Sequence, residues 1–381
     1  MKFIHTADWH LGKLVHGVYM TEDQRYMLKQ LVKLVEEEQP DCLVIAGDLY
    51  DRSVPPVAAV ELLNEVLFTI NVKLGVPIVA IGGNHDSAER LSFGSSWYQQ
   101  SNFYLAGKLT DTVESVNIKG VNFHLVPFAE PGLVKYAFND DRISSHEEAM
   151  KAIIEKIDKN MNHNEPNVLV GHAFVLGGET TDSERILSVG GSGCVSASNF
   201  DLFNYTALGH LHSPDAISHD KIKYAGSLMK YSFSEAKQQK SVSIVEMNEN
   251  GTFQLERKSL KPLRDMREIE GYLEELLDEG YYSEQKKDDY LKVTLLDDGA
   301  LIDPINKLRQ IYPNILHLER KRTLQDMKKK THLNILTDER KSELELFTHF
   351  YQEVTTAEFT KEKQNIIVDV IEKMRREGVG Q

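Results

Sequence analysis

The chain has 381 residues, of which 41% are hydrophobic and 27% are charged. This length and apolar content are enough for a large buried core, and they predict two or more folded domains. The sequence contains nothing close to the roughly 20 consecutive apolar residues of a membrane span, and residues 1–6 are typical of a β-strand rather than of a signal peptide. We therefore expect a globular, cytoplasmic protein that does not bind membranes.

The formal net charge of −14 at first disfavours a polyanionic partner, because phosphate binding depends on Lys and Arg. The acidic excess lies mainly in the first part of the chain. Residues 1–250 hold 32 acidic and 21 basic side chains, whereas residues 301–381 hold 15 basic and 13 acidic ones. Carboxylates that bind divalent cations add to such an excess without repelling phosphates once the metals are bound. The charge therefore does not exclude a nucleic acid as partner.

The first part of the chain alternates apolar strands with helix-period segments, which is the pattern of an α/β domain. We predict strands at residues 3–6, 43–46 and 76–81, and helices at 21–38 and 55–71. Each strand is followed by polar side chains, and ligands collect where the strands of such folds end. These side chains are Asp8 and His10 after the first strand, Asp48 after the second, and Asn84, His85 and Asp86 after the third.

The second part of the chain also places polar side chains after apolar strands, but its strands have more antiparallel character. Strands are predicted at residues 121–126, 168–170, 205–208, 222–224 and 242–247, and a helix at 144–161. His172 follows one of these strands, and His210 and His212 follow another. Since side chains two residues apart on an extended segment share a face, we expect His210 and His212 to point the same way, as Asp8 and His10 do.

Seven of these polar residues form a candidate metal site: Asp8, His10, Asp48, Asn84, His172, His210 and His212. A single buried histidine is more often a satisfied core group, but five such strand-end segments in one chain are hard to obtain by chance. Carboxylate, imidazole and amide ligands suit Mn²⁺, Fe²⁺ or Zn²⁺, and the absence of thiolates disfavours a structural zinc site. Seven ligands are too many for one ion and suit two ions that share a carboxylate. Such sites hydrolyse phosphate esters.

A role for each residue follows from this hypothesis. We assign Asp8, His10 and His212 to one ion, Asn84, His172 and His210 to the other, and Asp48 to both as a bridge. The predicted catalytic residues are His85, which would stabilise transition-state charge or protonate the leaving oxygen, and Asp86, which would orient His85.

The motifs Asp-x-His, Gly-Asp, Gly-Asn-His-Asp, Gly-His and Gly-His-x-His, in this order, resemble those of the calcineurin-like metallophosphoesterases. Residues 5–13, 47–51, 181–185, 207–212 and 224–228 are similar to the bacterial SbcD nucleases within that superfamily, and the similarity covers essentially all of residues 1–265. The resemblance implies a four-layer α/β/β/α sandwich with a small α+β cap domain and C-terminal helices. Every ligand position of the family pattern is filled.

The resemblance also implies a function. The family members are Mn²⁺-dependent DNA nucleases with two metal ions per subunit, which form homodimers and work with an SbcC-type ATPase subunit. They combine an ATP-dependent double-strand exonuclease with a single-strand and hairpin endonuclease, and they act in DNA repair, recombination and replication. The residues alone indicate only a phosphoesterase.

Three domains are predicted: a nuclease domain at residues 1–261, a DNA-binding cap at 262–336 and a helical partner-binding segment at 337–381. In the cap we expect a helix around 269–277, a strand at 290–295, a helix at 304–311 and a strand at 315–318. Its densest basic cluster is a candidate DNA contact, although such runs are more often solvated faces. The cluster comprises Arg320, Lys321, Arg322, Lys328, Lys329 and Lys330.

Two amphipathic helices are predicted in the C-terminal segment. Their apolar residues could pack on the cap, but the resemblance favours docking on the coiled coil of the ATPase. The candidate partner-binding residues are Leu344, Phe347, Tyr351, Ile367 and Ile371.

Two other functions use the same features. A protein phosphatase or cyclic nucleotide phosphodiesterase would need the same two-metal site, and residues 48–52 resemble the Asp-x-Val-Asp-Arg pattern of protein phosphatases. The long cap and the terminal helices count against that class. A non-catalytic scaffold for DNA ends is disfavoured because His85 and every predicted ligand are present.

Overall fold

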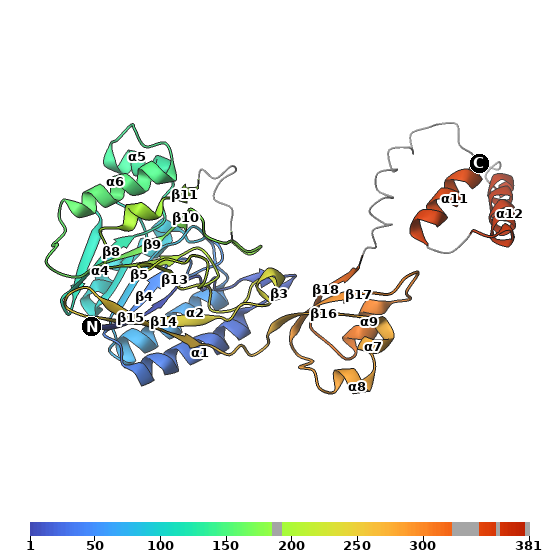
Figure 1. Ribbon diagram of the computed structural model, residues 1–381, viewed down its shortest axis with the longest axis horizontal. Coiled ribbons are helices and arrows are strands. Elements are labelled where there is room, and N and C mark those ends of the chain that lie inside the picture. The colour runs from blue at the N-terminus through green and yellow to red at the C-terminus, as the bar shows by residue number, and fades with distance from the viewer. Residues whose placement is uncertain (185–192, 322–342, 356–358, 378–381) are drawn as a thin grey trace. The chain divides into compact units, whose positions relative to one another are not determined.

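The computed structural model describes residues 1–184, 193–321, 343–355 and 359–377. The chain forms two compact units, Met1–Met266 and Arg267–Gln381, whose elements are labelled in Figure 1. The predicted boundary after residue 261 lies a few residues before the division between the units, and the one after residue 336 lies outside the described residues. The division into three domains therefore stays a prediction.

Two sheets form the centre of the first unit. One has the strand order β15-β14-β1-β4-β5-β6. Strands β1, β4, β5 and β6 are parallel, and β14 runs antiparallel to both of its neighbours, β1 and β15. Its strands are β15 Phe253–Ser259, β14 Ser241–Met247, β1 Lys2–Thr6, β4 Cys42–Ala46, β5 Ile78–Ile81 and β6 Phe103–Ala106.

The other sheet has the order β13-β12-β9-β8-β7, and β7 alone runs antiparallel to its neighbour in this described sheet. Its strands are β13 Ile222–Tyr224, β12 Tyr205–Gly209, β9 Asn167–His172, β8 Val121–Val126 and β7 Glu114–Ile118. Every residue of β4, β9 and β12 is buried. Strands buried on both faces suit these nearly continuous apolar runs.

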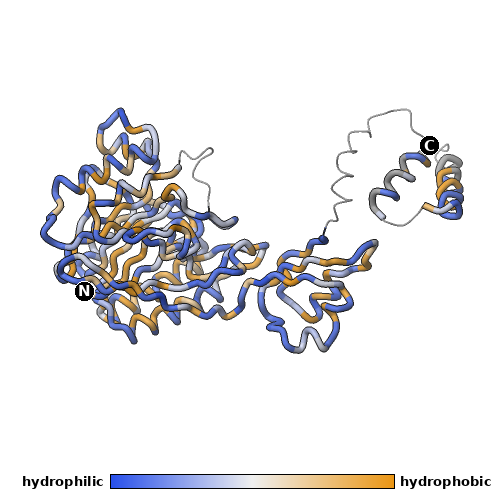
Figure 2. Tube along the Cα trace, in the orientation of Figure 1, coloured by the Kyte–Doolittle hydropathy of each residue, from blue (hydrophilic) through white to orange (hydrophobic). Residues whose placement is uncertain are grey.

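The two sheets pack face to face through a shared apolar core. The ring of Phe3 in β1 meets the ring of Phe123 in β8 edge to face at 5.5 Å and that of Tyr205 in β12 at 5.6 Å. Figure 2 shows hydrophobic residues concentrated in the strands of this unit and hydrophilic residues along its loops. Burial of apolar surface between the sheets is the main force that holds them together.

Helices cover the outer face of each sheet. Helix α1, Thr21–Glu38, buries Met27, Leu28, Leu31 and Val35, whose spacing forms one apolar stripe. It lies with α2, Val57–Phe68, on one side of the sheets, and α5, Pro131–Phe138, lies with α6, His146–Asp158, on the other (Figure 1). The predicted four-layer α/β/β/α sandwich is therefore confirmed, and α1 has the predicted bounds.

The remaining elements of this unit are short and lie in its connections. They are β2 Leu14–Val15, β3 Val18–Tyr19, the π-helical turn Thr69–Lys73, α3 Ala88–Ser92, α4 Ser95–Tyr98, β10 Phe174–Val175, β11 Cys194–Val195 and the 3₁₀ turns Gln99–Ser101, Ala197–Phe200 and Phe233–Glu235.

The second unit begins with a small three-stranded sheet in the order β16-β17-β18. Its elements are β16 Met266–Gly271, α7 Leu273–Leu276, α8 Glu279–Tyr282, β17 Tyr290–Leu295, α9 Pro304–Arg309 and β18 Ile315–Arg320. The predicted helix around 269–277 is wrong in its first part. Ile269 and Gly271 are buried while Glu268 and Glu270 are exposed, and this alternation of period two suits a strand.

Two further helices, α11 Glu343–Val354 and α12 Lys361–Glu377, confirm the predicted terminal helices. Phe359, just before α12, lies against the rings of Phe347 and Tyr351 of α11, with centroids 5.9 Å and 4.9 Å apart. Among the described residues, no helix is both long enough and apolar enough to cross a membrane.

Candidate metal centre

The predicted ligands lie at the carboxyl ends of β1, β4 and β5 in one sheet and of β9 and β12 in the other. The loops after β1 and β4 are joined by backbone hydrogen bonds, in which Asp8 N donates to Gly47 O and His10 N donates to Asp48 O. Gly209 lies opposite His172 in the pairing of β12 with β9. Both sheets of the sandwich therefore contribute side chains to the same site.

A first cluster consists of Asp8, His10 and His212, all buried, whose ligand atoms lie within 4.8 Å of one another. His10 Nε2 lies 3.0 Å from His212 Nε2. Two imidazole nitrogens at this distance, beside a carboxylate, can both bind one cation. This is the set predicted for one ion.

A second cluster surrounds Asn84. Its Oδ1 lies 2.9 Å from His172 Nε2 and 3.2 Å from His210 Nδ1. The Nδ1 atom of His172 donates to Ala46 O at 2.9 Å, which leaves its Nε2 atom free to bind a cation. Asn84, His172 and His210 are the three residues predicted for the other ion.

Asp48 lies between the two clusters. Its Oδ2 atom is 3.6 Å from His10 Nε2 and 3.3 Å from His172 Nε2, and its Oδ1 atom accepts a hydrogen bond from His85 N at 2.8 Å. The Asp48 carboxylate therefore reaches both sets of imidazoles, as a bridging ligand must.

The backbone of this centre differs from the expectation of extended segments. Asp8, His10, Asp48 and His210 have positive φ angles of 53°, 45°, 50° and 103°. Such angles are uncommon outside glycine and cluster at functional sites. The prediction that Asp8 and His10 share a face as on a strand is therefore wrong in its reason, although both side chains do enter the same cluster. His210 and His212, which were expected to point the same way, instead enter different clusters.

Two glycines allow the loops to approach closely. A Cβ atom on Gly83 would lie 2.2 Å from Asp48 Oδ1, and one on Gly209 would lie 2.1 Å from Ala46 O and 2.9 Å from His172 Nδ1. Neither position leaves room for a side chain. Glycine is required at both positions for steric reasons, because the segments that carry the candidate ligands pack directly against each other.

Burial acts strongly on the charges of the centre. It raises the pKa of Asp8 to about 7 and lowers the pKa of His210 to about 3. Burial would also lower the pKa of His172, but the Asp48 carboxylate beside it prevails and raises this pKa to about 9. Burial likewise opposes ionisation of Asp48, whose pKa His172 nevertheless holds well below its usual range. The centre thus pairs the Asp48 carboxylate with a His172 imidazole that protonates readily, whereas burial keeps the His210 imidazole neutral.

A pair of divalent cations fits these residues. Buried carboxylates without a compensating cation are unfavourable, and the converging atoms are carboxylate oxygens, imidazole nitrogens and one amide oxygen, which suit Mn²⁺, Fe²⁺ or Zn²⁺. The buried amide nitrogen of Asn84 has no hydrogen-bond partner among the described residues, whereas its oxygen faces two imidazoles. The amide is therefore oriented to present its oxygen to a metal.

Within this described loop, Asp86 does not accept the expected hydrogen bond from the His85 ring, whose Nδ1 atom contacts Asp51 O instead. The Asp86 carboxylate instead accepts backbone N–H groups of Leu49, Tyr50 and Gly83 at 3.1, 2.9 and 2.9 Å. Its contacts tie the loop after β5 to the loop after β4. Asp86 is therefore placed as a positioning residue and not as the partner of His85.

His85 is oriented by Asp51. Its Nδ1 atom donates to the carbonyl oxygen of Asp51 at 2.8 Å, and the Asp51 carboxylate forms an ion pair with Lys13 Nζ at 2.8 Å. Because a carbonyl can only accept, Nδ1 must carry a proton, and the Nε2 edge of His85 remains available. Sequence reasoning missed Asp51 and Lys13, although both lie within motifs that it identified.

Two other residues that sequence reasoning missed hold the loop of Trp9 and His10. Gln24 donates to His10 O at 2.7 Å and accepts Gly12 N–H at 3.0 Å, and Tyr231 donates to Trp9 O at 2.5 Å. Gln24 lies on α1. Tyr231 lies after β13 and is distant in sequence from the loop that it contacts. No local pattern in the sequence marks either residue.

The candidate DNA contacts lie elsewhere in the chain. Arg320 donates to Gly299 O at 2.5 Å, and Lys321 pairs with Glu270 at 2.7 Å, so both cations have partners within the second unit. The other members of the cluster lie outside the described residues. They are Arg322, Lys328, Lys329 and Lys330.

Two of the candidate partner-binding residues form contacts within the pair of terminal helices. Phe347 and Tyr351 contact Phe359, and Lys363 Nζ donates to Tyr351 Oη at 2.6 Å. Leu344, Ile367 and Ile371 are half-buried. The apolar side chains of α12 that are exposed instead are Ile366, at 61%, and Val370, at 46%.

Both units of the chain are similar to known protein families. Residues 1–214 match the calcineurin-like phosphoesterase family. Residues 262–355 match the SbcD_C family, described as the type 5 capsule protein repressor C-terminal domain. The SbcD subunit of the SbcCD nuclease from Staphylococcus epidermidis is 41% identical over 318 residues, which are 84% of this chain and 85% of that protein.

Two solved structures are similar at low sequence identity. A dimetal phosphatase from Danio rerio is 11% identical, with a TM-score of 0.41, over 69% of this chain and 98% of that one. A protein from Thermus thermophilus is 11% identical, with a TM-score of 0.39, over 68% of this chain and 99% of that one.

Proposed function

Because the chain belongs to the SbcD family of calcineurin-like phosphoesterases, and is thus a phosphodiester hydrolase, we propose that it is the Mn²⁺-dependent nuclease subunit of an SbcC/SbcD-type complex. The observation that carries the proposal is the position of Asp48 between two clusters of ligand atoms. In this proposal the first ion is held by Asp8, His10 and His212, and the second by Asn84, His172 and His210. Asp48 binds both.

When bound, two such ions would supply an activated water and neutralise charge on the phosphate during an in-line displacement. The protein positions these groups through the loops that Gly83 and Gly209 allow to approach each other. Asp86 holds the loop after β5 in register with Leu49 and Tyr50. Together these contacts fix the ligand geometry before substrate arrives, which favours catalysis because no reorganisation is then needed.

His85 is the proposed catalytic residue. Its ring centroid lies 4.7 Å from that of His10, beside the first cluster, while its Nδ1 proton is committed to Asp51 O. Its Nε2 atom is therefore the one that can face a phosphate bound at the metals. In the protonated form this atom donates a hydrogen bond to a phosphate oxygen or a proton to the leaving oxygen. Lys13, through its ion pair with Asp51, steadies that arrangement.

DNA is the proposed substrate, with ATP-dependent exonuclease activity on duplex ends and endonuclease activity on single strands and hairpins, in DNA repair, recombination and replication. The relative named as the SbcD subunit of the SbcCD nuclease supports this choice over a phosphopeptide. The second unit is the proposed DNA-binding cap, with Arg320 and Lys321 as its described candidate contacts. A location in the cytoplasm remains a prediction.

An SbcC-type ATPase is the proposed partner of the terminal helices. The exposed Ile366 and Val370 on α12 support this, because an amphipathic helix commonly binds a partner by its exposed apolar face. The two residues replace Ile367 and Ile371 as the best-placed contacts, since the latter are half-buried.

We also propose a homodimer. The first unit has a surface cavity of about 480 Å³ formed by α2, α3, α4 and the loops beside them, and the nearby Phe68, Phe93 and Trp97 are 50%, 71% and 70% exposed. Among the described residues that line this cavity, Arg90 alone is charged. A surface with so few cations is poorly suited to bind DNA. It is suited to pack against the same apolar surface of a second copy of the chain. Monomeric proteins rarely expose such patches.

The substrate class is tested by incubating the chain with hairpin DNA, single-stranded DNA, linear duplex and a phosphopeptide, each with and without Mn²⁺. We expect cleavage of the single-stranded and hairpin DNA with Mn²⁺ alone and cleavage of duplex ends only when the ATPase and ATP are added. Turnover of the phosphopeptide in preference to every DNA would contradict the proposal.

The dimer is tested by measuring the molecular masses of wild type and Trp97→Asp by light scattering. We expect a dimer for the wild type and a monomer for the variant, and a monomeric wild type would refute the proposed dimer.

A further inference from the structure

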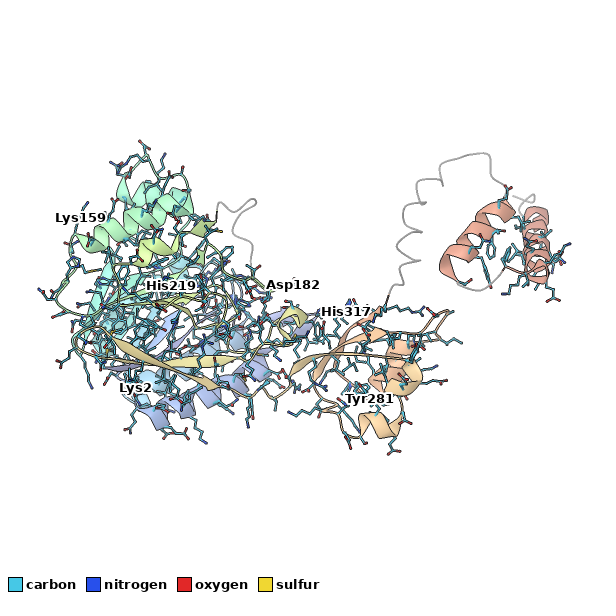
Figure 3. All side chains as sticks on the ribbon, viewed as in Figure 1. Lys2, Lys159, Asp182, His219, Tyr281 and His317 are labelled. Atoms are coloured by element: carbon cyan, nitrogen blue, oxygen red, sulfur yellow. The ribbon has the colours of Figure 1, made fainter. Side chains whose placement is uncertain are left out.

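The imidazole of His212 is supported by a chain of polar groups that ends in a buried ion pair. Ser183 Oγ lies 2.6 Å from His212 Nδ1 and 2.5 Å from Glu235 Oε1. Glu235 Oε2 in turn lies 2.5 Å from Lys240 Nζ. His212, Glu235 and Lys240 are 1%, 0% and 5% exposed, whereas Ser183 between them is half-buried. The labelled Asp182 in Figure 3 precedes Ser183.

The ion pair determines the direction of every hydrogen bond in this chain. Lys240 can only donate, and its ammonium forms a close ion pair with the buried Glu235 at 2.5 Å, which keeps Glu235 ionised. Glu235 is thus a carboxylate and can only accept, so the Ser183 hydroxyl must donate to it. The lone pairs of that hydroxyl then accept from His212 Nδ1–H. The His212 tautomer is therefore set with its proton on Nδ1 and a bare Nε2.

Lys240 and the neighbouring Glu184 also fix the backbone of His212. Lys240 Nζ donates to His212 O at 2.8 Å, and His212 N donates to Glu184 Oε1 at 2.8 Å. The ring and the main chain are thus held at once. The bare Nε2 atom faces His10 Nε2 at 3.0 Å, within the cluster that includes Asp8.

We propose that Ser183 and Glu235 are positioning residues that hold His212 in its metal-binding tautomer and so preorganise the ion position shared with Asp8 and His10. The inference rests on the proposed role of His212 as a ligand. It assigns a function to a buried ion pair that stability alone does not explain, because such pairs are often no more stabilising than apolar residues of similar volume.

The test is Ser183→Ala in the full-length chain. This change removes the link to His212 but leaves the Glu235–Lys240 ion pair, and Glu235 Oε1 keeps contacts with Tyr231 N at 3.3 Å and Ser232 Oγ at 3.2 Å. Loss of a hydrogen-bond partner behind a metal ligand typically weakens metal binding by ~10–100-fold. We expect that increase in the dissociation constant of one Mn²⁺ ion, with the other unchanged.

Two variants serve as controls. Ser183→Thr retains a hydroxyl and should restore the wild-type affinity. Ser234→Ala removes the acceptor of the neighbouring hydrogen bond from Asp182 N, at 3.0 Å, without touching His212. It should therefore bind both ions as wild type does. Manganese titration followed by electron paramagnetic resonance resolves the two affinities.

A second readout uses the metal-free protein. Nitrogen-15 NMR of the histidine rings should show His212 protonated on Nδ1 in the wild type and a mixture of tautomers in Ser183→Ala. Unchanged affinities and an unchanged tautomer would overturn the inference, as would equal weakening of both ions in Ser183→Ala. If wild type itself binds no pair of ions, the proposed function fails instead, and the two failures are thereby distinguished.

Discussion

Gly83→Ala should impair the centre without altering any proposed ligand. The added Cβ atom would lie 2.2 Å from Asp48 Oδ1, 2.4 Å from Asp48 N and 2.7 Å from Asp48 Cγ. Carbon atoms pack best at about 3.5–4.0 Å, so the loop after β4 or the loop after β5 must move by roughly 1 Å. A misplacement of that size can reduce the rate ~10²-fold. Because Asp48 is the proposed bridge, we expect weaker binding of both ions as well.

The matched control is Gly132→Ala. Gly132 lies in α5, and its added Cβ atom would meet nothing within 4 Å. Alanine in a helix should stabilise the protein by about 0.4–1 kcal/mol, with activity unchanged. The assay compares Mn²⁺ affinity and cleavage of single-stranded DNA for both variants. A Gly83→Ala protein with wild-type affinity and rate would show that the close approach of these loops does not position Asp48.

Other changes separate chemistry, metal binding and partner binding. His85→Asn should retain both ions while losing ~10²–10³ in rate, and loss of an ion in metal analysis would make His85 a ligand instead. Chelation of the metals should lower the melting temperature, since each site contributes about 2.7 kcal/mol at a metal concentration 100 times its dissociation constant; a melting temperature unaffected by chelator would argue against tight sites. Ile366→Asp with Val370→Asp should abolish co-purification of the ATPase but keep basal cleavage of single-stranded DNA, and retention of the ATPase would exclude this surface of α12.

The convergence of the proposed metal ligands could be predicted because parallel strands end at a common edge. Asp48 and Asn84 follow strands that the apolar runs of the sequence define clearly, and His172 ends another, so their convergence required no knowledge of loop geometry. The same reasoning did not reveal the left-handed backbone of Asp8 and His10, because local sequence rarely specifies a positive φ for a residue with a side chain.

Contacts between distant segments were not predictable. Glu235 reaches the His212 ring through Ser183, and Lys240 donates to the His212 carbonyl, but no periodicity or spacing relates these residues in the sequence. Asp86 was expected to orient His85 because the two are adjacent, whereas the fold places backbone N–H groups of another loop against its carboxylate. In the second unit, residues 269–277 satisfy both a helical and a strand period, and pairing of β16 with β17 decides between them.

The central claim is that one carboxylate, Asp48, joins two metal ions in this centre. The most direct measurement is the number of Mn²⁺ ions bound per chain, by titration calorimetry with metal analysis, in wild type and in Asp48→Ala. We predict two ions in the wild type and no tightly bound ion in the variant, because the bridge contributes to both positions. An Asp48→Ala protein that still binds two ions with wild-type affinity would contradict the proposed bridge.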